Sequence, residues 1–553
     1  MKNEPKPRVL VIGIDGGTLD LIRPWAERGS LPALADLIKG GVSGPLESTM
    51  PPVTSPAWPS FMTGKNPGKH GVFDFIRNKQ GDFTLVNASS IDGKTLWGIL
   101  SEAGYKVGVM NVPVTYPPSP VNGFMITGLL SPPNADLCHP PGFLKPYEAE
   151  LGRYRIVPRV EYREGDEEAL IEDLLDLTQT QGRFALRVME TQPWDFLMVH
   201  FLATDIAQHS LWRFMDPTHP RHNPAAAEEL KSGIQRVYQA VDRMINLMRE
   251  RLPTDVTIIV MSDHGFGPLH YIVNLNSYLL MLGLLRLKNR PTTQLRWTAF
   301  RMGLSPAHAY EWIARLGLQN LTWKVSKEQR NRIISRFLSF EDVDWSRTKA
   351  YSMGHVGQLY VNLKGREPHG IVEPGAEYEA VREYLIAALR ELRDPHTGKP
   401  IVDRILRKEE VCSGPYFDRS PDLYVVMDGY RYISFPLFAS RVDVITQQIR
   451  GDSGSHRQHG VFIAHGRHIR AGTQVAGARI VDIAPTILYS MGVPVPDDMD
   501  GRVLTEIFEP GYSLSHAIQY SKTEPAPAMT EYTMSAEEEQ EVLDRLRDLG
   551  YLG

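Results

Sequence analysis

Residues 9–16 read VLVIGIDG, an unbroken aliphatic run that ends in an acid, Asp15, followed by glycine. Short runs of this kind are typical of strands buried on both faces, as in a parallel sheet. The runs FLMV and VTIIVM come shortly before two further acids, Asp205 and Asp263. Because ligands bind beyond the carboxyl ends of the strands in open α/β sheets, we expect the three acids at one active-site edge.

Strand-like and helix-like segments alternate around these runs from residue 8 to about 270, and again from Tyr351. This alternation predicts an α/β fold with a central, mostly parallel sheet flanked by helices. The stretch between these two alternating regions is helix-like and basic. It would either cap a site for an anion, or form a solvated helical face or a subunit contact. The predicted divisions are a catalytic core in two parts, 1–270 and 350–510, a helical basic insert, 271–349, and a helical C-terminal tail, 511–553.

The composition excludes several classes of protein. Hydrophobic residues make up 42% of the 553 residues and charged residues 23%, as in soluble globular proteins, and a net charge of −5 argues against a nucleic-acid partner. The two cysteines, Cys138 and Cys412, cannot form a disulfide framework or a cysteine metal site, so we expect free thiols. No stretch approaches the roughly 20 apolar residues of a membrane span, and no apolar leader precedes the first strand. We therefore expect a cytoplasmic protein.

Several acids and histidines have spacings that suit metal binding, because divalent metals take carboxylate and imidazole ligands. Asp205 and His209 are four residues apart, so on a helix they face the same side. His264 directly follows Asp263, and His456 lies in a Gly-Ser-His segment. A single histidine is more often structural than a ligand. Three acids and three imidazoles together favour one shared two-metal site.

Thr54 is the candidate nucleophile, in the segment PPVTSP at residues 51–56. A proline soon after the start suits the first turn of a helix, which would place Thr54 at a helix N-terminus, where anions are stabilised. A threonine hydroxyl becomes a good nucleophile when a metal lowers its pKa. Two alternatives remain: Thr54 acts only as a helix cap, or Ser55 is the nucleophile. No P-loop, Gly-x-Gly-x-x-Gly or Gly-x-Ser-x-Gly motif is present to suggest other chemistry.

As a set, these segments resemble the alkaline phosphatase superfamily, and within it the type I phosphodiesterase/nucleotide pyrophosphatase family with its phosphohydrolase and phosphomutase relatives. The resemblance covers most of residues 8–505 but neither the insert nor the tail. The segments that carry it are 11–16, 52–56, 63–71, 204–209, 262–265, 454–457, 482–488, 492–496 and 500–501.

The resemblance implies an alkaline-phosphatase-like sheet and a centre of two divalent metal ions. Zinc is the usual metal of the family, and manganese is credible because carboxylates predominate on one side. Thr54 would attack phosphorus to form a phospho-threonine, which water would then release. The implied ligands are Asp205, His209 and His456 for one metal, and Asp15, Asp263, His264 and the Thr54 oxygen for the other.

One departure from the family concerns the substrate. Nucleotide pyrophosphatases have an asparagine that touches a phosphate oxygen where this chain has Asp74 and Phe75. Asn111, Asn362 or Arg366 would have to supply that contact. We predict a metal-dependent phosphohydrolase for a small anionic phosphoester, foremost a phosphodiester. The alternatives are a phosphomonoesterase or phosphomutase and, from another class, a non-catalytic binding module on a phosphatase fold.

Overall fold

The computed structural model describes residues 6–79, 82–160, 162–302, 338–436, 438, 444–447, 451–523 and 531–549. Its largest sheet has ten strands, and the strands at its centre all run parallel, as predicted. In spatial order the strands are β20 (Thr473–Gln474), β2 (Val42–Glu47), β19 (His459–His465), β9 (Thr257–Met261), β1 (Val9–Ile14), β8 (Phe196–Phe201), β5 (Val107–Met110), β6 (Gly123–Ile126) and β7 (Cys138–His139), with β21 (Ala478–Arg479) beside β2.

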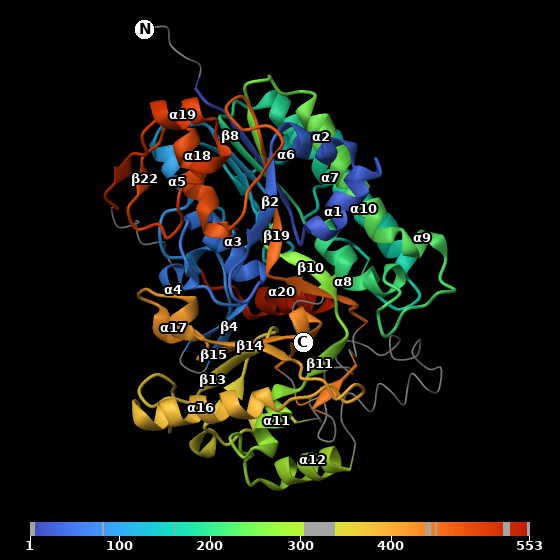
Figure 1. The fold of residues 1–553 in the computed structure, drawn as a ribbon, viewed down its shortest axis with the longest axis vertical. Helices are drawn as coiled ribbons and strands as arrows, with labels where there is room; N and C mark the ends of the chain where they lie inside the picture. The colour runs from blue at the N-terminus through green and yellow to red at the C-terminus, as the bar shows by residue number, and fades with distance from the viewer. Residues whose placement is uncertain are drawn as a thin grey trace.

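Helices cover this sheet on both faces (Figure 1). Along β1, Leu10 and Ile12 enter one core while Val9 and Val11 enter the other, because successive strand residues point to opposite faces. This double burial explains the unbroken apolar run in the sequence. The first core takes α1 (Leu19–Glu27), α2 (Pro32–Gly40), α7 (Glu167–Thr191), α8 (Ala203–Met215) and α10 (Gly233–Arg249); the second takes α3 (Thr54–Thr63), α5 (Leu96–Glu102) and α18 (Ile483–Ser490). Among the described residues, no helix is both long and apolar enough to cross a bilayer.

A second, seven-stranded sheet lies below the first in Figure 1 and packs against α11 (Leu275–Met281) and α16 (Ala376–Arg390). Its strands are β12 (Ala350–Ser352), β13 (Gln358–Val361), β15 (Leu423–Met427), β16 (Tyr432–Ser434), β11 (Tyr271–Val273) and β17 (Ile445–Thr446), with β14 (Val402–Arg407) beside β15.

The second sheet differs from the predicted division of the chain. It takes β11 from the predicted helical insert and six strands from the predicted second part of the core, and the chain rejoins the main sheet only at β19. An alternation of strand-like and helix-like segments predicts that strands are present, but it does not predict which sheet each strand joins. Helices do occur in the insert, at α11 and at α12 (Pro291–Arg301), whereas residues 303–337, which hold many of its basic side chains, lie outside the described residues.

The predicted helix near the C-terminus is α20 (Ala536–Asp548), and it packs back onto the N-terminal half of the chain. Val542 and Leu546 are fully buried. The Leu85 backbone N–H donates to the Glu539 carboxylate, and the Arg545 guanidinium donates to the Ser131 carbonyl. The helix is therefore part of the main core.

Helix α3 begins at Thr54, with Val53 in the N-cap position, and all ten of its residues are buried. The short helix α4 (Pro67–His70) follows and is fastened to α3 through His70. The His70 Nε2 lies 2.8 Å from Ser60 Oγ, and its Nδ1 accepts a hydrogen bond of 3.3 Å from the Val72 backbone N–H. Burial, followed by the charge of Lys65, lowers the pKa of His70 to about 3.

This neutral, buried histidine predicts a pH dependence of stability. In the unfolded chain the His70 ring takes up a proton near its ordinary pKa of 6.5, whereas in the folded chain it does so only near pH 3. The free energy of unfolding is therefore highest above pH 6.5 and falls as the pH is lowered. One proton changes the unfolding free energy by about 1.4 kcal/mol per pH unit, so the wild type should lose roughly 2–3 kcal/mol more than His70→Gln between pH 6.5 and 4.5. Urea unfolding of both proteins at the two pH values measures this difference. Equal losses would show that His70 contributes nothing to acid sensitivity.

Candidate metal centre

The three acids converge because the three strands before them are neighbours. Strand β1 pairs in parallel with β8 on one side and β9 on the other, so the carboxyl ends of all three lie at one edge of the sheet. Asp15 directly follows β1, and Asp263 follows β9 after one residue. Asp205 lies in the first turn of α8, just beyond β8. All three side chains are buried.

The first cluster consists of Asp205, His209 and His456, whose ligand atoms all lie within 4.8 Å of one another. Asp205 and His209 are one turn apart on α8, as their spacing predicted, while His456 comes from β18 (Gly454–Arg457), which pairs with β10 (Gly265–Pro268). The His456 Nε2 lies 3.4 Å from Asp205 Oδ1 and 3.0 Å from His209 Nε2. Since the His456 Nδ1 can donate to the Pro52 carbonyl at 2.9 Å, its Nε2 lone pair is left facing the cluster.

The second cluster consists of Asp15, Asp263 and His264, again within 4.8 Å of one another. The His264 Nε2 lies 3.1 Å from Asp263 Oδ2 and 3.7 Å from Asp15 Oδ1. The Thr54 Oγ1 lies 3.1 Å from the same Nε2. The two clusters adjoin, because the His264 and His456 rings stack with their centroids 3.6 Å apart. All seven predicted ligand residues are thus brought together.

The contacts of the two hydroxyls favour Thr54 over Ser55 as the reacting group. Thr54 touches the His264 ring, whereas the buried Ser55 Oγ makes no hydrogen bond with any described residue. Thr54 is also the first residue of α3 and not its N-cap, so capping does not account for its hydroxyl.

The electrostatics of the site fit bound cations. Burial, together with the charges of Asp263 and Asp205, raises the pKa of Asp15 well above its ordinary value. Asp15 Oδ1 accepts no hydrogen bond from any described residue, although it is buried. Buried carboxylates are costly unless they are paired or coordinate a metal. Burial also lowers the pKa of His209 to about 4, so this ring is neutral near pH 7, the form that binds metals.

Two residues near the acids were not identified from the sequence. His200 on β8 places its Nε2 2.8 Å from Asp15 Oδ2. Phe266 on β10 packs edge-on against His209, at 4.8 Å between centroids, and against His456 at 5.4 Å. A polar residue within the apolar run FLMVHF was a signal for His200. Phe266 gave no signal beyond its place after the Asp-His-Gly segment.

The structure does not bring the predicted phosphate contacts into the clusters. The Asn111 amide donates to the His200 carbonyl and its oxygen accepts from Tyr154. The Asn362 amide donates to three backbone carbonyls in the loops beside the second sheet, and Arg366 forms a two-pronged ion pair with Asp422. These polar groups are already engaged, so their geometry does not support a role in binding phosphate.

Asp74, where the resemblance implied an asparagine, links the loop after α4 to strand β13 of the second sheet. It accepts hydrogen bonds from the Phe75 backbone N–H at 2.6 Å and from the Gln358 amide at 2.9 Å. Burial raises the pKa of Asp74 to about 6.

Cys138 and Cys412 are free and buried, as expected from the sequence.

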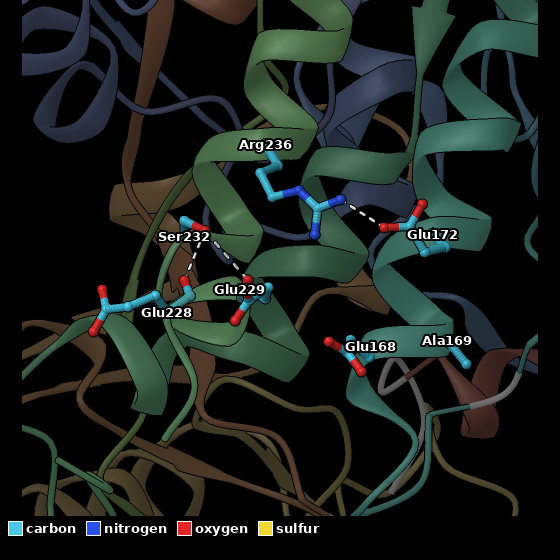
Figure 2. Close-up of a pocket in the computed structure, with 7 residues that line it drawn as sticks. All are labelled: Glu168, Ala169, Glu172, Glu228, Glu229, Ser232 and Arg236. Carbon is cyan, nitrogen blue, oxygen red and sulfur yellow. Dashed lines mark hydrogen bonds and ion pairs between the residues drawn. The ribbon is translucent and has the colours of Figure 1, made fainter. Parts of the chain in front are cut away.

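A surface hollow elsewhere on the molecule has the wrong charge for a phosphoester. It lies between the start of α7, the short helix α9 (Glu228–Lys231) and α10 (Figure 2). Arg236, its one cation, is paired with Glu172. The remaining acids that line it are Glu168, Glu228 and Glu229.

Comparison with known proteins shows which family and fold the chain resembles. The model of the type I phosphodiesterase / nucleotide pyrophosphatase family matches residues 9–437. No curated protein matches the chain.

Among the solved structures that match, two illustrate the shared fold at low sequence identity. One is murine ectonucleotide pyrophosphatase / phosphodiesterase 5, an inactive form in complex with AMP, at 12% identity and a TM-score of 0.50, covering 91% of this chain and 100% of that one. The other is phosphonoacetate hydrolase from Sinorhizobium meliloti 1021 with phosphonoacetate, at 14% identity and a TM-score of 0.51, covering 88% and 96%. The fold is therefore alkaline-phosphatase-like, and the chain belongs to the type I phosphodiesterase / nucleotide pyrophosphatase family.

Proposed function

We propose that this protein is a metal-dependent phosphoric ester hydrolase that cleaves small anionic phosphodiesters through Thr54. The observation that carries the proposal is the contact of 3.1 Å between Thr54 Oγ1 and His264 Nε2, inside one of two adjoining ligand clusters. Family membership supports the class of reaction. The two related structures hold small phosphate or phosphonate compounds, AMP in one and phosphonoacetate in the other, which supports a small anionic substrate.

The fold suits Thr54 to attack a phosphoryl group. As the first residue of α3, it lies where backbone N–H groups have no partner within the helix and where the helix dipole favours anions. All ten residues of α3 are buried, so the hydroxyl is held on a rigid element. Thr54 is itself 0% exposed, so substrate reaches it only when neighbouring groups move.

The clusters would hold two divalent ions, zinc or manganese, as the chemistry of their side chains suggests. Asp205, His209 and His456 would bind one ion, and Asp15, Asp263, His264 and the Thr54 oxygen the other. Such ions act as Lewis acids on phosphoryl oxygens and lower the pKa of a bound hydroxyl.

The reaction proceeds in two displacements at Thr54. Its Oγ1 forms a bond to phosphorus as the bond from phosphorus to the leaving oxygen breaks, and the hydroxyl proton passes to that oxygen, so that the leaving group departs as an alcohol. Water then attacks the phospho-threonine, releases the phosphate monoester and restores the hydroxyl.

The direct test compares an aryl phosphodiester with its monoester on metal-stripped protein to which zinc or manganese is returned. We expect the diester to be hydrolysed faster with at least one of the metals, and a chelator to abolish turnover reversibly. A faster monoester would favour the phosphomonoesterase alternative. No turnover of either ester with metals bound would favour the binding module.

Substitution of the nucleophile gives a second prediction. Thr54→Ala should lower kcat by about 1,000-fold or more, because it removes the atom that attacks phosphorus. Ser55→Ala is the matched control, an adjacent buried hydroxyl on the same helix, and should retain near wild-type kcat. Steady-state rates on the aryl diester measure both. If Ser55→Ala were the inactive protein, the nucleophile would be Ser55.

A further inference from the structure

Behind the Asp15 carboxylate lies a second buried group, His200. The His200 Nε2 is 2.8 Å from Asp15 Oδ2, and the two residues are 1% and 0% exposed. A carboxylate that binds a metal is ionised and only accepts hydrogen bonds, so in the metal-bound site the His200 nitrogen is the donor. The other oxygen, Asp15 Oδ1, is the one that faces His264, at 3.7 Å, and it has no donor among the described residues. One oxygen of Asp15 is thus held and the other is left for the cluster.

The His200 ring is closely packed on the side of β1 and Trp58. Its residue pairs with Gly13 on β1, and a side chain at Gly13 would come within 3.1 Å of the His200 ring and 2.8 Å of Trp58. The Trp58 indole meets the His200 ring edge-on, at 4.8 Å between centroids. The Asn111 amide holds the backbone carbonyl of His200 at 3.2 Å. Glycine is required at position 13 because these two rings occupy the space above it.

We propose that His200 is a positioning residue that holds Asp15 Oδ2 so that Oδ1 is presented to the metal ion of the second cluster. This inference rests on the proposed two-metal function. A group that fixes a metal ligand in this way typically contributes 10–100-fold to metal affinity. A histidine that only filled space in the core would affect folding stability and leave the affinity of the site unchanged.

The experiment measures zinc affinity of the full-length chain by competition with a chelating dye. An Asp205→Ala background removes the first cluster, so that the remaining zinc reports on the cluster that contains Asp15. In this background His200→Phe keeps the bulk of the ring but has no donor, and it should weaken zinc binding by about 10–100-fold. His200→Gln restores an N–H donor at a similar reach and should recover most of the affinity.

His70→Phe is the matched control, because His70 is also a buried ring with a hydrogen bond, but to Ser60 and not to a cluster residue. It should leave zinc affinity unchanged, and circular dichroism establishes that each variant is folded. Unchanged affinity in a folded His200→Phe, or a His200→Gln no better than His200→Phe, would overturn the inference. If the wild-type protein bound no zinc at all, that result would instead contradict the proposed function itself.

Discussion

Three carboxylates buried side by side at one edge of the sheet are the constraint on which the rest of this structure depends. Like charges at short range and away from water repel strongly, and the raised pKa of Asp15 reflects both burial and its two acidic neighbours. Three imidazoles face the same space, with nitrogens as close as the 3.0 Å between His209 and His456. Cations between these groups would replace the repulsion among the carboxylates with coordination.

The scaffold around the acids keeps them in this arrangement. The chain turns sharply after Asp15 at Gly16, whose φ of +64° suits glycine, and a side chain there would come within 2.7 Å of Phe266. Phe266 in turn packs against the histidine rings of the first cluster. The same segment therefore needs glycine at 13 for His200 and Trp58 and at 16 for the turn and Phe266. This accounts for the pattern Gly-Ile-Asp-Gly in physical terms.

Sequence reasoning succeeded where the signal was local. The apolar runs before Asp15, Asp205 and Asp263 identified buried parallel strands, and their order along the sheet then brought the acids together. The second sheet was not foreseen, because β11 lies in a stretch that the sequence analysis predicted to be helical, and a short strand such as β12 carries no local sign of the sheet it enters.

The same limit applies to side chains outside the motifs. Asn362 was a candidate only by residue type, and its amide is engaged with backbone carbonyls that no motif could reveal. His200 was missed because its importance comes from its neighbour across the sheet, Asp15. Contacts of this kind depend on pairing between strands, which the sequence encodes only indirectly.

Anomalous diffraction from crystals of the wild-type protein grown with zinc or manganese tests the central claim most directly. The account predicts two peaks about 3.5–4 Å apart. One should lie among Asp205, His209 and His456, and the other among Asp15, Asp263, His264 and the Thr54 oxygen, with ligand distances near 2.0–2.2 Å for zinc. A single peak, or peaks only in the acidic hollow of Figure 2, would contradict it.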